Sequence, residues 1–276
     1  MRIAVLGLGI IGSAWATNLI ADGHAVLTWN RTPKEFPGFV PTAAAAVEPA
    51  DIVIVVVADP PAVSSVLDQI EPVLRPGQTV IQSSTISSEW TLEFADRVAK
   101  AGADFLEAPF TGSKPAAEAR KTVYYIGGDI KVLTHVKPVL ERLSQTIIHI
   151  GPLGSASSLK LAMNVNIAGV ALALTESLAI ARKAGIADEI FFDALHVNAG
   201  RSGVADLKEP KLKAHDYSPQ FSVKHMLKDL NLALETADDI PLVLTPAARE
   251  LYQRGADAGL ADDDFIGLAR LIDPDA

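Results

Sequence analysis

The first 32 residues constrain the fold more than any other part of the chain. Residues 2–6 form a short apolar run typical of a buried strand, and the glycine-rich segment Gly7–Gly12 (GLGIIG) follows directly. The apolar spacing of residues 14–20 is helical, Gly23 ends that pattern, and residues 25–29 form a second apolar run. A glycine turn between a strand and a helix is the context that the dinucleotide-binding fingerprint requires. The sequence therefore predicts a dinucleotide-binding unit here.

The spacing of the three glycines has a chemical reason. Gly7 permits a tight turn, Gly9 lets the backbone approach a pyrophosphate, and Gly12 lets the helix pack closely against the strand. The free N–H groups at the start of the helix would then bind the pyrophosphate. The predicted cofactor contacts in this turn are Gly7, Leu8, Gly9, Ile10, Ile11 and Gly12.

The end of the second predicted strand indicates which nicotinamide cofactor binds. An NAD site usually places Asp or Glu there, bonded to the ribose 2′-hydroxyl. This chain has Asn30, Arg31 and Thr32 instead. A carboxylate would repel a 2′-phosphate, whereas an arginine can pair with one through two parallel hydrogen bonds. We therefore expect these three residues to favour NADP(H) over NAD(H).

Composition limits the remaining possibilities. A net charge of −9 argues against nucleic acid or an anionic membrane surface as a partner. The chain has no cysteine, which excludes thiolate zinc sites and fits a cytoplasmic protein. Its six histidines show no helical i, i+4 pair, so we expect no metal site. Polar residues interrupt the most apolar stretch, 162–180, which therefore predicts a buried helix and no membrane span.

The hydrophobic period divides the chain into two halves. Strand and helix patterns alternate in the first half, and the continuous apolar run 51–57 is typical of a central parallel strand. Ligands gather at the carboxyl ends of such strands, here at Val57 and Ala58. Beyond Gly154 only helical patterns remain. Later strands are predicted at 78–82, 104–107, 123–126 and 146–150.

The expected fold class is α/β, with two domains. A doubly wound parallel sheet of the Rossmann type occupies residues 1–155 and binds NADP(H). An all-α domain for substrate binding and oligomerisation occupies residues 156–276, and a long helix over about 156–184 joins the two. Because the helical half has more apolar surface than one domain can bury, we expect a homo-oligomer, and specifically a dimer.

Four segments of the chain resemble the β-hydroxyacid dehydrogenase family, which includes 3-hydroxyisobutyrate dehydrogenase. The first is the glycine turn with Asn30–Thr32, and the second is Glu107–Ser113 (EAPFTGS), similar to the family's substrate loop, usually Asp-Ala-Pro-Val-Ser-Gly-Gly. Gly154–Asn164 resembles its Gly-x5-Lys-x3-Asn segment, and Lys228–Leu230, with Phe221 upstream, resembles its Lys-Asp-Leu motif. The spacing Phe-x2-Lys-His-x2-Lys-Asp is most similar to the glyoxylate/succinic semialdehyde reductases.

The resemblance implies roles for individual residues. Hydroxyls and backbone N–H groups in a glycine turn form an anion nest, so the substrate carboxylate would bind at Thr111, Gly112 and Ser113. It also implies that Thr85 lies near the nicotinamide or the substrate, that Lys228 lies near the cofactor, and that Phe221 forms an apolar wall of the substrate pocket. The implied catalytic residues are Lys160, Asn164 and Asp229.

Reaction chemistry gives Lys160 a role independently of the resemblance. Hydride transfer to a carbonyl leaves an alkoxide that needs a proton from a general acid. A lysine with an ordinary pKa of about 10.4 is protonated at neutral pH, so reduction needs no adjustment of that pKa. Asn164 lies four residues after Lys160 and therefore shares its helix face. The prediction is an NADPH-dependent reductase of a small aldehyde or keto acid.

Two alternatives stay open. An imine reductase has the same architecture, but that group usually replaces the catalytic lysine. A non-catalytic NADP-binding module, as known in chromatin-associated members of the family, also lacks the lysine and carries basic extensions. The chain also departs from the family pattern in two places. Thr111 stands where serine is usual, and Glu118–Lys121 lacks a usual glycine. These departures bear on the identity of the substrate more than on the type of reaction.

Overall fold

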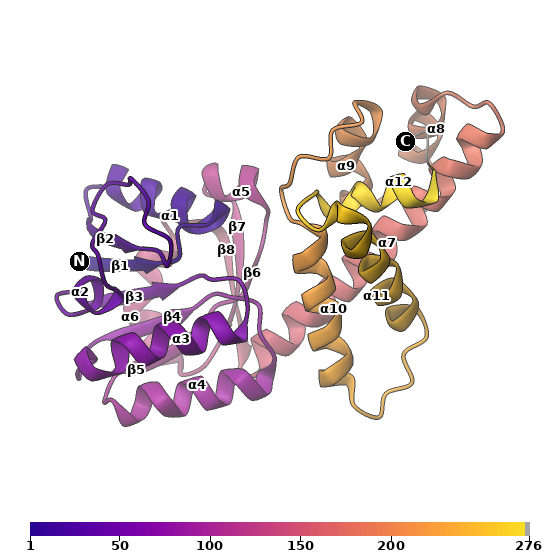
Figure 1. Cartoon of the computed structure of the whole chain (residues 1–276). Coiled ribbons are helices and arrows are strands. Elements are labelled where there is room, and N and C mark those ends of the chain that lie inside the picture. Colours follow the sequence, from indigo (N-terminus) through magenta and orange to yellow (C-terminus); the bar gives the residue numbers. More distant parts are fainter. Residues whose placement is uncertain (274–276) are drawn as a thin grey trace. The chain divides into compact units, whose positions relative to one another are not determined.

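The computed structural model describes residues 1–273, which form two compact units. The first comprises residues 1–161 and the second begins at residue 162, within one continuous helix. Figure 1 shows a sheet with flanking helices in the first unit and helices in the second. This confirms the predicted fold class, an α/β domain with a doubly wound sheet followed by an all-α domain, joined by a long helix.

The sheet of the first unit begins with five parallel strands. Their order is β2-β1-β3-β4-β5, the arrangement of a doubly wound fold. Further strands follow at the β5 edge, where β7 runs antiparallel to β5 and β6 and parallel to β8. The strands are β1 (Arg2–Leu6), β2 (Ala25–Trp29), β3 (Ile52–Val55), β4 (Thr79–Gln82), β5 (Asp104–Glu107), β6 (Phe110–Thr111), β7 (Thr122–Gly127) and β8 (Ser144–Gly151).

Helices cover both faces of this sheet, as the alternation of side chains along the strands requires. In β1, Ala4 and Leu6 belong to one core with α2, α3 and α4, whereas Ile3 and Val5 belong to a second core with α1 and α6. The helices of this unit are α1 (Ile10–Ala21), α2 (Ala43–Val47), α3 (Pro60–Ile70), η1 (Glu71–Val73), α4 (Ser88–Lys100), α5 (Lys114–Glu118) and α6 (Ile130–Leu140).

The short strand β6 is the one strand of this unit that the sequence pattern did not predict. It continues β5 after a break at Pro109, because Glu107 lies opposite Gly127 and Thr111 lies opposite Val123 in a single antiparallel register. Proline cannot donate to a ladder, but its carbonyl oxygen accepts from the Tyr125 N–H at 2.9 Å. The predicted substrate loop is therefore partly an edge of the sheet.

Arg120 accounts for one departure from the family pattern. Its φ of +60° lies in the left-handed region that favours glycine. The guanidinium forms two hydrogen bonds to the carboxylate of Asp22, at 2.6 and 3.0 Å, and donates to the Arg142 carbonyl oxygen. Arg120 thus ties together the ends of two helices of the first unit, and its charge is paired with Asp22.

In the described part of the second unit, all the regular elements are helices. Its core includes α7 residues Ala168, Ala171, Leu174 and Leu178. The helix α7 is apolar and long enough by length and composition to cross a bilayer, but these residues pack within the folded unit. The helices are α7 (Ser155–Lys183), α8 (Asp188–His196), α9 (Gly203–Lys213), α10 (Val223–Ala237), α11 (Leu244–Gly255), η2 (Ala256–Leu260), η3 (Phe265–Leu268) and α12 (Ala269–Ile272).

Candidate active site

In the glycine turn, the fold itself requires glycine at two positions but not at the third. Gly7 has φ +110°, and a Cβ there would collide with the carbonyl oxygen of Val56. A Cβ at Gly12 would collide with the carbonyl oxygen of Gly7. A Cβ at Gly9 would meet no protein atom within 4 Å. The backbone surface at Gly9 is therefore open to a ligand, as an approaching pyrophosphate needs.

The start of α1 differs from the other long helices of this unit. Its N-cap residue is Gly9, which provides no side-chain hydrogen bond, and its first turn has no acidic residue. Side chains do cap α3, α4 and α6, namely Asp59, Ser87 and Asp129. An uncapped N-terminus next to a glycine turn suits an anionic group.

The end of β2 is bonded to the glycine turn. The side-chain oxygen of Asn30 accepts from the Leu8 N–H at 2.9 Å, and its amide nitrogen donates to the Thr32 carbonyl oxygen at 2.7 Å. Arg31 and Thr32 are exposed beside this contact. The Lys34 ammonium donates to the Leu8 carbonyl oxygen at 2.5 Å, which adds a cation that the sequence analysis missed. Lys34 follows Thr32 by only two residues, so its position in the sequence could have indicated a second cation near the predicted cofactor-binding residues.

The loops after β3 and β4 are also joined. The Val57 N–H donates to the Ser84 hydroxyl at 2.8 Å. The side chain of Gln82 bonds both the N–H and the carbonyl oxygen of Ser84, which fixes the turn that leads to the half-buried Thr85. Gln82 and Ser84 were not predicted, and they act by shaping the loop near the predicted Thr85.

The predicted anion nest lies at the end of β6. Thr111 is the last residue of that strand, Gly112 has φ +111°, and Ser113 is the N-cap residue of α5 with no side-chain cap hydrogen bond. All three residues are half-buried. Partly exposed hydroxyls beside a left-handed glycine are compatible with binding a carboxylate.

The two catalytic candidates on α7 are both buried. Lys160 is 8% exposed and Asn164, one helical turn later, is 2% exposed. A lysine is rarely buried without a partner or a function. Among the lysines and arginines of residues 1–161, Lys160 is the one that is buried.

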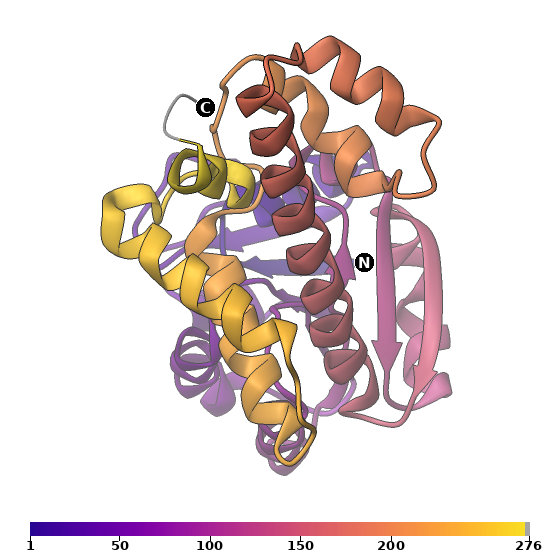
Figure 2. The ribbon, with the colours of Figure 1, turned by 90° about the vertical axis from the view of Figure 1, so that its right-hand side faces the viewer.

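Asn164 and Asp229 form a buried polar pair inside the second unit. The Asn164 amide nitrogen donates to one carboxylate oxygen of Asp229, and the Lys228 ammonium lies 2.8 Å from the other. Figure 2 shows α7 running beside α10, which carries Asp229. The structure thus brings together Asn164, Lys228 and Asp229 of the predicted set. Lys228, predicted near the cofactor, is an ion-pair partner of Asp229.

Phe221 lies just before α10 and packs among rings. Its ring is stacked 6.0 Å from that of His225 and edge-on, also at 6.0 Å, to Phe265. The Nδ1 of His225 lies 2.6 Å from the Ser222 hydroxyl. His225 and Asp229 lie four residues apart on α10 and so share one face of that helix. The ring of Phe221 stacks on His225 at the start of this face.

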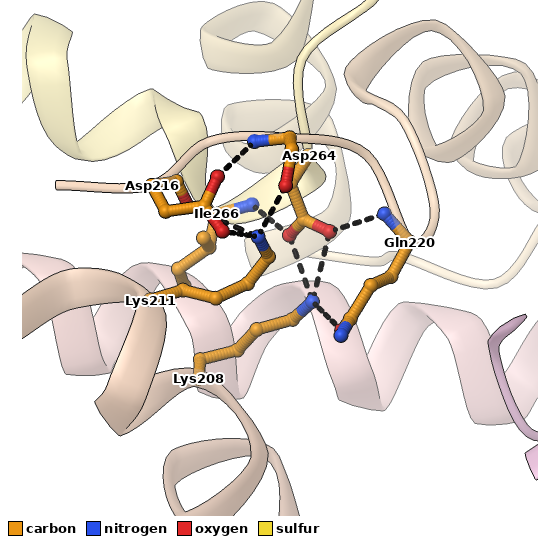
Figure 3. Close-up of polar contacts among 7 residues, drawn as sticks. Lys208, Lys211, Asp216, Gln220, Asp264 and Ile266 are labelled. Atoms are coloured by element: carbon orange, nitrogen blue, oxygen red, sulfur yellow. Dashed lines mark hydrogen bonds and ion pairs between the residues drawn. The ribbon is translucent and has the colours of Figure 1, made fainter. Parts of the chain in front are cut away.

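A buried ion pair fixes the segment that leads to Phe221. The Lys208 ammonium lies 2.8 Å from the Asp264 carboxylate. Figure 3 shows this pair with Gln220 beside it. The same carboxylate accepts from the backbone N–H groups of Gln220 and Ile266. Burial lowers the pKa of Lys208, and the charge of Asp264 opposes that effect. The Asp264 carboxylate therefore joins α9, the segment before α10 and η3.

Comparison with known sequences identifies the family. Residues 2–151 match the family described as the NAD binding domain of 6-phosphogluconate dehydrogenase. Residues 154–272 match the family described as NAD-binding of NADP-dependent 3-hydroxyisobutyrate dehydrogenase.

Individual relatives agree with these matches. The chain is 30% identical to glyoxylate/succinic semialdehyde reductase 1 of Arabidopsis thaliana, over 99% of this chain and 98% of the relative. It is 29% identical to the mouse (Mus musculus) cytokine-like nuclear factor N-PAC, over 98% of this chain but only 50% of that protein.

A solved structure gives the same result. The 3-hydroxyisobutyrate dehydrogenase of Mycobacterium tuberculosis, in a structure with L-serine, is 28% identical, with a TM-score of 0.87 and 98% of both chains covered. The chain therefore belongs to the β-hydroxyacid dehydrogenase family of nicotinamide-dependent oxidoreductases.

Proposed function

We propose that this protein is an NADPH-dependent reductase of small carboxylate-bearing aldehydes or keto acids, of the glyoxylate and succinic semialdehyde type. The observation that carries the proposal is Lys160, a buried lysine on α7, one turn before an asparagine held by the buried carboxylate of Asp229. The relationship to the Arabidopsis reductase supports the substrate class.

The cofactor would bind at the first unit. Gly9 and the uncapped start of α1 would hold the pyrophosphate, and Arg31, with Lys34 nearby, would pair with a 2′-phosphate. The loop residues Val57, Ala58 and Thr85 follow β3 and β4 at the carboxyl edge of the parallel sheet, where cofactors of this fold lie. NADPH, when bound, supplies the hydride.

The substrate carboxylate would bind at Thr111, Gly112 and Ser113. Their hydroxyls and backbone N–H groups are neutral donors suited to one carboxylate. L-serine, present in the mycobacterial structure, is a 3-hydroxy acid with a carboxylate, which supports this type of ligand. Phe221 would provide an apolar wall.

Lys160 would complete the reaction as the general acid. The carbonyl oxygen gains negative charge as the carbonyl carbon is reduced, and the Lys160 ammonium would donate a proton to it. Asp229 accepts a hydrogen bond from the Asn164 amide nitrogen and so fixes the orientation of that amide. An amide oxygen can accept from an ammonium or a hydroxyl group. Asn164 would therefore bind or orient, and Asp229 would hold it in place.

We further propose a cytoplasmic homodimer. The second unit exposes large apolar side chains on several helices and loops, as expected where another copy packs. These residues include Ile180, Ile190, Val197, Val243 and Leu244.

The proposal is tested by following NADPH oxidation with glyoxylate, succinic semialdehyde, methylglyoxal and a cyclic imine, with NADH in parallel. We expect turnover of the carboxylated aldehydes, with NADPH preferred. Turnover of the imine alone would favour an imine reductase. Tight NADPH binding without turnover of any compound would favour a non-catalytic NADP-binding module, the alternative that the presence of Lys160 argues against.

A further inference from the structure

Glu107 is a buried carboxylate that the proposed reaction does not use. It lies at the end of β5 and is fully buried. One of its oxygens accepts from the Ala156 N–H at 3.1 Å, and the other accepts from the N–H and the hydroxyl of Ser157, at 3.0 and 2.5 Å. These are groups of the first turn of α7, so the side chain of Glu107 caps this helix from another part of the chain.

The surroundings of Glu107 are built to hold this carboxylate. A Cβ at Gly127 would collide with a carboxylate oxygen of Glu107, so the absence of a side chain there makes room for it. On the other side, the Ser157 hydroxyl lies 2.8 Å from the hydroxyl of Thr91, which extends the polar contact to α4. The negative charge at the N-terminus of a long helix is also favoured by the helix dipole.

Glu107 links the two chain segments that carry the groups that the proposed reaction must align. Lys160 follows Ser157 by three residues, and because Cα–Cβ bonds tilt toward the N-terminus of a helix, its side chain projects over the turn that Glu107 holds. Thr111 follows Glu107 by four residues, in the same antiparallel register against β7. One carboxylate thus joins the strand that leads to the anion nest to the helix that carries the proton donor.

We propose that Glu107 is a positioning residue that sets the placement of Lys160 relative to the anion nest at Thr111–Ser113. It touches neither cofactor nor substrate. Its removal loosens the first turn of α7 and misplaces the ammonium, which lowers kcat while the glycine turn, formed by β1 and α1, continues to bind NADPH. This inference rests on the proposed function for its kinetic consequence, but the contact between Glu107 and α7 does not.

The test compares Glu107→Gln with Glu107→Asp in the full-length protein. Glutamine keeps one acceptor oxygen and presents an NH2 group to the other donors, whereas aspartate keeps two charged acceptors on a shorter side chain. We expect kcat to fall roughly 10- to 100-fold in E107Q, as for an active-site misplacement of about 1 Å, and less in E107D. The KM for NADPH should change by less than about twofold.

Two further variants separate positioning from stability. Thr91→Val removes a buried hydroxyl that contacts Ser157 but not Glu107, and it should lower the unfolding temperature with kcat unchanged. Ser157→Ala removes one of the three hydrogen bonds to Glu107 and should lower kcat by less than E107Q does.

Hydrogen exchange gives a readout that does not depend on turnover. The amides of residues 156–160 should exchange faster in E107Q than in the wild type, with exchange in α1 unchanged. A folded E107Q with wild-type kcat, or with unchanged exchange in this turn, overturns the inference. If E107Q does not fold, kcat and the amide exchange of residues 156–160 are measured in S157A instead. A wild-type protein that reduces none of the carbonyl compounds refutes the proposed function, and faster exchange in E107Q then still supports the role of Glu107 in holding α7.

Discussion

The side-chain oxygen of Asn30 accepts a hydrogen bond from the backbone N–H of Leu8, and this contact fixes the end of β2 against the glycine turn. The same side chain donates to the Thr32 carbonyl oxygen. An aspartate could accept from Leu8 but could not donate to Thr32 when ionised. The amide at this position therefore serves the fold itself, and it leaves the neighbouring Arg31 exposed beside the turn.

Replacing Arg31 should change the choice of cofactor. If Arg31 pairs with the 2′-phosphate, Arg31→Ala loses a charge-assisted contact worth about 1.5 to 3 kcal/mol, so the Kd of NADPH should rise by roughly one to two orders of magnitude. The Kd of NADH, which lacks that phosphate, should stay nearly constant. Fluorescence titration with both cofactors measures the difference. Lys100→Ala, which removes an exposed cation on α4, is the control; equal weakening for both cofactors would contradict the assignment.

Two glycines of the same turn should respond differently to an added methyl group. Gly12→Ala meets the carbonyl oxygen of Gly7, so it should lower the unfolding temperature of the free protein. Gly9→Ala meets no protein atom, so the free protein should lose much less stability than with Gly12→Ala, with only the weaker N-cap preference of alanine to lower it, while its affinity for NADPH falls. Thermal unfolding with and without NADPH distinguishes the two. Full stabilisation of the Gly9→Ala variant by NADPH would show that the pyrophosphate does not approach this position.

The helices and strands were predictable because the hydrophobic pattern of each is set by residues close together in the sequence. The parallel strands and the glycine turn could be predicted from a few adjacent residues, since buried strands and tight turns each restrict residue type. The strand β6 was missed because it is short and pairs with residues 123 and 124, a partner that no local pattern indicates.

The contacts that organise the candidate site were less accessible to sequence reasoning. Glu107 appears in the sequence as part of a loop motif, and nothing near it indicates that it caps a helix 49 residues later. Lys208 and Asp264 are 56 residues apart and look like ordinary surface charges in a helix and a loop. Such pairings depend on the tertiary fold, whereas the sequence shows only that the charges exist.

Breaking the buried ion pair of the second unit should be costly. Asp264→Asn leaves the Lys208 ammonium buried without its counter-charge, which typically costs about 3 to 5 kcal/mol. Urea unfolding of the variant should show the loss as a lower midpoint. Asp262→Asn, two residues away, removes the partner of Lys224 in an exposed pair and should change the midpoint little. Similar midpoints for the two variants would mean that burial adds nothing to the importance of Asp264.

The stability of the second unit should depend on pH through Asp188. Two hydrogen bonds from the Arg182 guanidinium, at 2.9 and 2.7 Å, lower the pKa of Asp188 below its ordinary value of 3.8. A carboxylate whose pKa is lower in the folded state contributes its full stabilisation above the unfolded-state pKa and loses it as pH falls through the folded-state pKa. The unfolding midpoint of Asp188→Asn should therefore lie below that of the wild type at about pH 6 and approach it below about pH 3. A difference between the two unfolding midpoints that stays constant over this pH range would show that the ion pair of Asp188 does not cause it.

Lys160 should be essential for turnover but not for cofactor binding. General acid catalysis by one side chain contributes typically 10²- to 10⁴-fold, so Lys160→Ala should lower kcat by roughly that factor while the Kd of NADPH changes little. Lys183→Ala, an exposed lysine at the far end of the same helix, should leave kcat unchanged. Lys160→Met keeps an apolar stem of similar length, so a rate as low as that of Lys160→Ala would assign the loss to the ammonium group and not to a cavity. A Lys160→Met variant with near wild-type kcat would mean that another group supplies the proton and that the burial of Lys160 serves packing alone.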